Sequence, residues 1–110
     1  MATTTPKRLA GPAALSVLAT PTTLLTVTAA HRYVVKQIII TNTTAANRTV
    51  VLSIGTPATA ANRLLSDVVL GPNEVTTIDT ALVLEAAETV QAYADAAASV
   101  NITLTGWDYV

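Results

Sequence analysis

Short apolar runs that alternate with threonine and serine recur along most of this chain. In residues 49–54, Val50, Leu52 and Ile54 occupy every second position, and residues 100–105 show the same alternation. A period of two with one apolar face is the pattern of a half-buried strand. The runs are residues 24–28, 33–42, 49–55, 64–70, 75–84, 89–94 and 100–110. Turn residues separate them at the spacing typical of an all-β sandwich.

The run at residues 33–42 is apolar on both faces. Strict alternation places Val34, Ile38 and Ile40 on one face and Tyr33, Val35 and Ile39 on the other. A strand of this kind is central in a sandwich or is covered from outside by a partner. We expect Tyr33, Val35 and Ile39 to face outward.

Residues 81–98 fit two structures. Their Ala and Glu content and an apolar stripe at helical spacing favour a helix. Leu82 and Leu84, and then Val90, Ala92 and Ala94, also fit a period of two. We prefer strand–turn–strand, because a lone helix would interrupt a series of strands.

The first 22 residues hold Pro6, Pro12 and Pro21 and show no regular period. We therefore expect an extended N-terminal arm over residues 1–22, followed by a single β-sandwich domain, jelly-roll-like or Ig-like, of about seven strands over residues 23–110. The uncharged stretch at residues 9–30 follows two basic residues, as a signal peptide or membrane span would. Gly11 and the prolines divide it into pieces too short for either, so we expect neither.

The composition limits the chemistry that the chain can carry out. Its 110 residues are 51% hydrophobic and only 12% charged, with no cysteine and a net charge of −1. Disulfides and zinc–cysteine sites are thereby excluded, and a basic track for nucleic acid is not expected. A mean hydropathy of +0.50 is high for a soluble monomer. We expect copies of the chain or a neighbouring subunit to cover some of its apolar surface.

Candidate catalytic and metal-binding residues are sparse. His31 is the single histidine, and we interpret it as a solvated or interface residue in preference to a catalytic one. No serine lies in a Gly-x-Ser-x-Gly context, the carboxylates lack the spacing of a calcium loop, and the isolated glycines form no phosphate loop. We expect no enzyme activity, cofactor or metal.

Trp107 and Tyr109 share one face of the last predicted strand. Two aromatic side chains so placed could form a platform for a sugar ring. Aromatic residues also anchor cores and subunit interfaces, and we favour that interpretation here.

Several segments together resemble the small all-β virion proteins of tailed bacteriophages, a group of capsid decoration proteins, head fibres and tail-associated β-sandwich modules. They are residues 6–12 (PKRLAGP), 35–45 (VKQIIITNTTA), 49–55 (TVVLSIG), 83–92 (VLEAAETVQA) and 100–106 (VNITLTG). The resemblance covers most of the chain and implies a structural role in the virion. Proteins of this group often carry glycine where Ala87 stands.

Composition and resemblance together predict a non-enzymatic virion protein, made in the host cytoplasm. The leading hypothesis is a capsid decoration or cement protein, a homo-oligomer and most simply a trimer, that stabilises the head shell by binding the major capsid protein. The expected contacts are Arg8, Leu9 and Leu15 of the arm and Tyr33, Val35 and Ile39 of the sheet. We expect no nucleic-acid or membrane partner.

Two alternatives keep the same fold. One places the chain in a tail, fibre or baseplate, where the arm would join a neighbouring tail protein. The other is a glycan-binding sandwich that uses Trp107 and Tyr109.

Overall fold

The computed structural model describes residues 4–110, and within them the chain is all-β apart from one 3-10 turn. The elements are β1 (Thr4–Ala14), β2 (Thr22–Thr26), β3 (Arg32–Asn42), β4 (Arg48–Ile54), η1 (Ala60–Asn62), β5 (Arg63–Leu70), β6 (Val75–Leu84), β7 (Thr89–Ala94) and β8 (Val100–Tyr109). The predicted all-β sandwich is confirmed, and β2 to β8 each overlap one of the seven apolar runs, with β2 beginning and ending two residues earlier than its run. No helix in residues 4–110 has the length and apolarity needed to cross a membrane.

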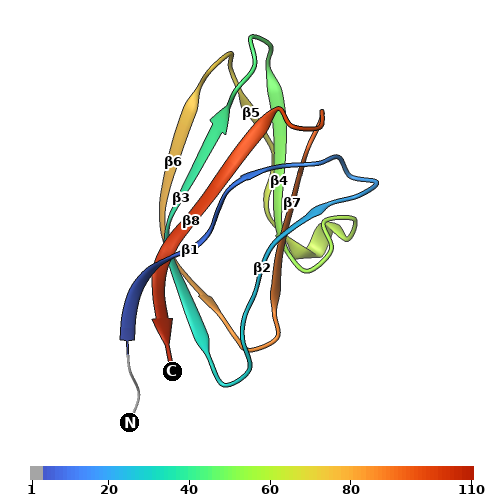
Figure 1. Ribbon diagram of the computed structural model, residues 1–110. Coiled ribbons are helices and arrows are strands. Elements are labelled where there is room, and N and C mark those ends of the chain that lie inside the picture. The colour runs from blue at the N-terminus through green and yellow to red at the C-terminus, as the bar shows by residue number, and fades with distance from the viewer. Residues whose placement is uncertain (1–3) are drawn as a thin grey trace.

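The strands pair as a nested set, the first with the last. β1 pairs with β8, β2 with β7, β3 with β6 and β4 with β5, all antiparallel. Lateral pairs of β3 with β8 and of β4 with β7 complete two four-stranded sheets. Sheet A has the order β1-β8-β3-β6 and sheet B the order β2-β7-β4-β5, and Figure 1 shows the two face to face. A long antiparallel hairpin rolled up in this way is an eight-stranded jelly roll.

β1 lies inside the segment that we expected to be an arm. Thr4–Ala14 are extended, but they pair with β8 from Thr4 opposite Tyr109 to Ala14 opposite Asn101. This part of residues 1–22 is therefore an edge strand of sheet A in the same chain. Pro6 and Pro12 fit there because an edge strand needs hydrogen-bond donors on one side only. Residues 1–3 lie outside the described part.

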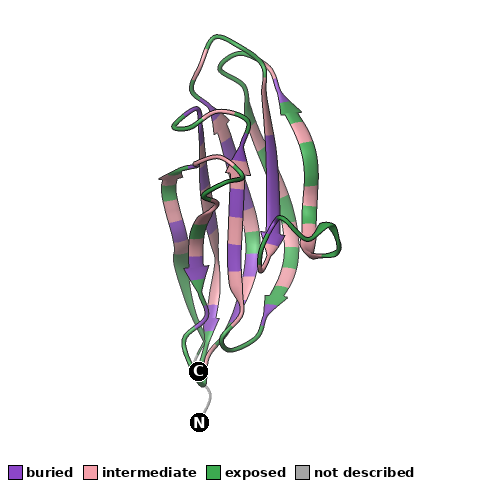
Figure 2. Cartoon of the chain, turned by 90° about the vertical axis from the view of Figure 1, so that its right-hand side faces the viewer, coloured by how far each residue is buried: buried purple, intermediate pink, exposed green. Residues whose placement is uncertain are grey.

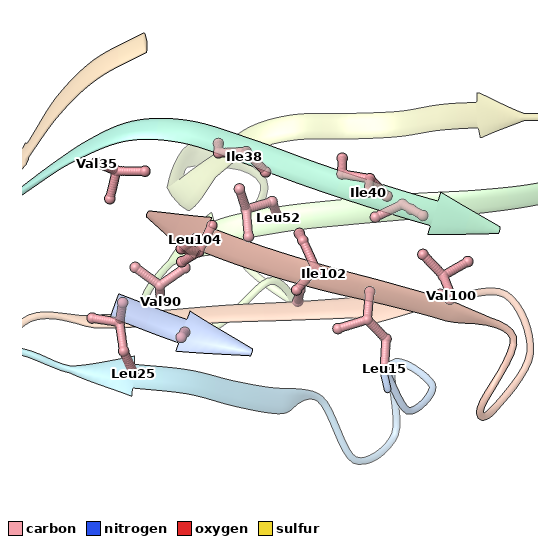
Figure 3. Close-up of a cluster of buried hydrophobic side chains, with 14 of the residues drawn as sticks. Leu15, Leu25, Val35, Ile38, Ile40, Leu52, Val90, Val100, Ile102 and Leu104 are labelled. Atoms are coloured by element: carbon pink, nitrogen blue, oxygen red, sulfur yellow. The ribbon is translucent and has the colours of Figure 1, made fainter. Parts of the chain in front are cut away.

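The core lies between the sheets, where purple buried positions alternate with exposed ones along the strands in Figure 2. In Figure 3, Val35 and Ile38 of β3 and Ile102 of β8 face Leu52 of β4 and Val90 of β7. Each of these side chains is at most 4% exposed. Burial of such side chains stabilises by about 1.5–3 kcal/mol apiece.

A β-bulge in β3 reverses which side chains face the core. Tyr33 and Val35 point inward, at 7% and 0% exposure, and beyond the register shift at Lys36 it is Ile38 that is buried. An extra residue in one strand moves every following side chain to the opposite face. The prediction that Tyr33 and Val35 face outward is therefore wrong, whereas Ile39 does lie on the outer face.

Gly106 of β8 sits opposite this bulge. A Cβ at that position would clash with the carbonyl oxygen of Val34 and would approach the backbone nitrogen of Lys36 to 3.0 Å. The bulge therefore depends on a residue without a side chain on the neighbouring strand.

Residues 81–98 adopt the strand–turn–strand structure that we preferred. β6 ends at Leu84, a turn follows, and β7 begins at Thr89. Ala87 occupies the left-handed region of the turn at φ 69°. The turn thus has the conformation that glycine favours, although the residue is alanine.

Part of the outer face of sheet B, around Val51, is covered by its own chain. Val51 lies outside the central core cluster and is nevertheless 0% exposed. It stands opposite Tyr93, whose ring lies 6.0 Å from the Arg63 guanidinium. Arg63 in turn donates from Nε to the carbonyl oxygen of buried Pro57 at 2.9 Å. These contacts hold the β4–β5 loop beside sheet B, on the side away from sheet A (Figure 1).

Candidate functional site

The outer face of sheet A carries a row of apolar side chains that no other element of residues 4–110 covers. Pro6 stands opposite Trp107, Trp107 opposite Val34, and Val34 opposite Val83, so the row crosses all four strands. Val83 is 48% exposed, and Tyr109 lies two positions beyond Trp107 at 38%. These five residues are called the sheet A patch below.

An open pocket of about 660 Å³ adjoins the sheet A patch. Its walls include Val34, Val83 and Tyr109 of the patch, together with Arg32 and Glu85. Arg32 donates from Nε to Glu85 Oε2 at 2.9 Å. Both side chains are more than half exposed, so this ion pair contributes little to stability and remains accessible to solvent.

Asp108 is the centre of a second polar cluster at the same end of the sandwich. Its Oδ1 lies 2.8 Å from His31 Nδ1, and its Oδ2 lies 3.6 Å from Lys7 Nζ. The same ammonium group is 5.5 Å from the centre of the Tyr33 ring, a cation–π contact. The hydrogen bond from His31 holds the pKa of Asp108 below its ordinary value of 3.8, with the charges of His31 and Lys7 adding to the effect.

This cluster joins β1, the β2–β3 turn and β8. An Asp–His pair orients an imidazole, as it does in hydrolases. Within residues 4–110, however, no hydroxyl group hydrogen-bonds to His31, and no three acidic or histidine side chains gather closely enough to hold a metal ion. The contacts that are present connect these three segments and stabilise their arrangement.

The His31–Asp108 pair was not predicted, although the sequence contains a signal for it. All six basic residues lie at or before Arg63, and all seven acidic residues follow it. Nested pairing places each strand of the basic half beside a strand of the acidic half. The ion pairs Lys7–Asp108, Arg32–Glu85 and Arg48–Asp95 all join the two halves.

The structure separates the predicted contact residues into two groups. Leu15, Tyr33 and Val35 are buried in the core and are not available at the surface, and half-buried Leu9 packs against the core. Arg8 is exposed on β1, and Ile39 is half-buried on the outer face of sheet A. Trp107 and Tyr109 share that face, as predicted from their spacing.

Fold and site together define a jelly-roll domain with one outer face partly covered by its own loop and the other open and apolar. No protein-family model matches the chain, and neither a curated protein nor a solved structure was found to be similar to it.

Proposed function

We propose that this chain is a non-enzymatic structural protein of a bacteriophage virion, most specifically a capsid decoration protein that binds the head shell through the outer face of sheet A. One observation carries the proposal. The sheet A patch exposes Val83 and Tyr109 beside half-buried Trp107, whereas on the outer face of sheet B the position of Val51 is buried and Val69, near the edge, is exposed. Contiguous apolar surface of this kind is typical of protein interaction sites, and jelly rolls are common in viral capsids.

The proposed mechanism is mass action. A subunit that binds the assembled shell, and not its separated subunits, lowers the free energy of the assembled state in proportion to its occupancy. Trp107 and Tyr109 would supply apolar contact area near the centre of the interface. Arg8 and Ile39 lie on the same face and would contact the shell around that centre.

The test is a binding measurement on purified shells that lack the protein. Trp107→Ala should weaken binding at least about tenfold, because aromatic residues at the centre of an interface carry much of the binding energy. Val69→Ala is the matched control, since Val69 is 62% exposed on β5 of sheet B. Equal binding by the Trp107→Ala variant and the wild type would remove the sheet A patch from the proposal.

Location within the virion is measured separately, by copy number in empty heads, isolated tails and whole particles. Many copies that follow the heads support decoration. A few copies that follow the tails would move the same structural role to a tail or baseplate.

The pocket favours a second candidate, glycan binding. Tyr109 offers a flat aromatic ring, and Arg32 and Glu85 offer a donor and an acceptor for sugar hydroxyls in the same pocket. The probe is host-cell polysaccharide in a titration calorimeter. Binding that is lost in both Tyr109→Ala and Arg32→Ala would support a glycan site, and absence of binding by the wild type would exclude one for that polysaccharide.

A further inference from the structure

The two open edges of sheet A carry opposite charges. β1, at one edge, holds Lys7 and Arg8 and no acidic residue. β6, at the other edge, and the turns beside it hold Glu74, Asp79, Glu85 and Glu88 and no basic residue. Below, these are called the β1 edge and the β6 edge.

The register of the sheet places the two opposite charges at the same level. Arg8 stands opposite Thr105, Thr105 opposite Gln37, and Gln37 opposite Asp79. Both end members of this row, Arg8 and Asp79, are exposed. Within residues 4–110 neither forms an ion pair.

The residues beside this charged pair are apolar on both edges. In an antiparallel contact with Arg8 opposite Asp79, Pro6 of the β1 edge stands opposite Ala81 of the β6 edge, and both are exposed. The two edges therefore match at this level, with one charged pair and one apolar pair.

Strand direction permits these edges to meet. Neighbouring strands of sheet A are antiparallel, so β1 and β6 at its ends run in opposite directions. A second copy, rotated about an axis that runs along the strands, presents its β1 antiparallel to β6 of the first. Rotation about that axis causes no shift along it, so Arg8 of one copy arrives level with Asp79 of the other.

Pairing of like edges is disfavoured. Two β6 edges side by side would oppose acidic residues, and two β1 edges would oppose Lys7 and Arg8. The remaining free edges belong to sheet B, where β5 carries an extra residue at its register shift and Asp67 at φ 53°. A bulge of this kind blunts an edge strand.

We propose that copies of this chain associate head to tail, the β1 edge of one against the β6 edge of the next, to form a closed ring. A head-to-tail contact uses two different surfaces of each copy and ends in a ring when the rotation closes. The ring leaves the outer face of sheet A free and oriented the same way in every copy.

The test is a charge exchange followed by sedimentation equilibrium of the full chain. Arg8→Glu and Asp79→Lys should each weaken association at least about tenfold, because each puts like charges together at the contact. The double variant Arg8→Glu/Asp79→Lys should associate about as tightly as the wild type. The control is Lys36→Glu/Asp79→Lys, since exposed Lys36 lies on the central strand β3 and the net charge is the same. Association of this control variant should remain as weak as that of the single variants.

Three results would overturn the ring. They are a wild-type chain that is monomeric at every concentration, single variants that associate normally, and a double variant no better than its control while circular dichroism shows it folded. If a reversal unfolds the chain, Arg8→Gln and Asp79→Asn replace it and should weaken association more mildly. Ring formation does not depend on shell binding, because sedimentation measures association of the protein alone. Rings that fail to bind shells would contradict only the proposed function.

Discussion

The two outer faces of this sandwich differ in what covers them. On sheet B, Val51 is fully buried because Tyr93, Arg63 and the β4–β5 loop lie over it. On sheet A, Val34 occupies a comparable outward position and is only half-buried, with 48%-exposed Val83 beside it. Both faces carry apolar residues, so hydrophobicity alone does not distinguish them. The covering loop therefore distinguishes the position of Val51 from the sheet A patch, although Val69 near the edge of sheet B is also exposed.

The largest effect is expected where sheet A holds its bulge. Gly106→Ala introduces a Cβ that clashes with the Val34 carbonyl oxygen, so the neighbouring strand must move. We expect the free energy of unfolding to fall by about 3 kcal/mol, the upper range for overpacked sites. Urea unfolding measures it, with Gly71→Ala as the control because only the Glu74 side chain lies near that Cβ. A small loss in Gly106→Ala would mean that the bulge accepts a side chain.

A matched pair of substitutions tests the difference between the two faces. Val51→Thr places a hydroxyl group under the cover of sheet B and should cost about 1–2 kcal/mol of unfolding free energy. Val34→Thr places the same group on open sheet A and should change it by less than about 0.5 kcal/mol. Equal losses in urea unfolding would show that the two faces are equally covered.

A pH-dependent effect is expected at the Asp108 cluster. Asp108→Asn should lower the unfolding free energy at neutral pH by about 1 kcal/mol, because the charged acceptor of His31 is lost. Since the folded pKa of Asp108 lies below its ordinary value of 3.8, its contribution is complete above that pH and disappears as the pH falls through the folded pKa. The difference between variant and wild type should therefore shrink in acid.

Thermal unfolding from pH 7 down to acid checks this prediction. Asp95→Asn is the control, because its contact with Arg48 is 4.0 Å long and 43% of the Asp95 side chain is exposed. The assignment fails if the Asp108→Asn variant and the wild type lose stability in parallel as the pH falls.

The smallest effect, of opposite sign, is expected in the turn that leads from sheet A to sheet B. Ala87 is held at φ 69°, which costs an L-residue about 1 kcal/mol relative to glycine. Ala87→Gly should therefore raise the unfolding free energy by up to about 1 kcal/mol. Ala86→Gly, at an exposed neighbour without positive φ, should lower it slightly. A loss in both variants would contradict the strain at Ala87.

The alternation of apolar residues was sufficient to predict most strands, because half-buried strands have a period of two whatever their partners are. β1 was not predicted as a strand, because Pro6 and Pro12 are typical of irregular segments. Only the pairing with β8 shows that they lie at the edge of a sheet. The inward orientation of the Tyr33 and Val35 side chains was not predicted for a similar reason. The bulge that causes it depends on Gly106, which is far away in the sequence.

The candidate site was less accessible to prediction than the fold. The spacing of Trp107 and Tyr109 placed them on one face, but nothing local indicates which face a loop will cover. His31 and Asp108 are 77 residues apart and meet only through nested pairing. The separation of basic from acidic residues along the chain would have indicated that its two halves pair.

Nested pairing also has a consequence for the order of folding. Among the strands of residues 4–110, only β4 and β5 are consecutive in the sequence and paired, and each further nested pair closes a longer loop, ending with β1 on β8. Because loop closure costs more entropy for longer loops, and chains rich in distant contacts fold slowly, we expect folding to start at the β4–β5 hairpin and to proceed outward. The strand that carries Lys7 and Arg8 would then be the last to dock. Until it does, β8 presents a bare edge to every other chain in solution.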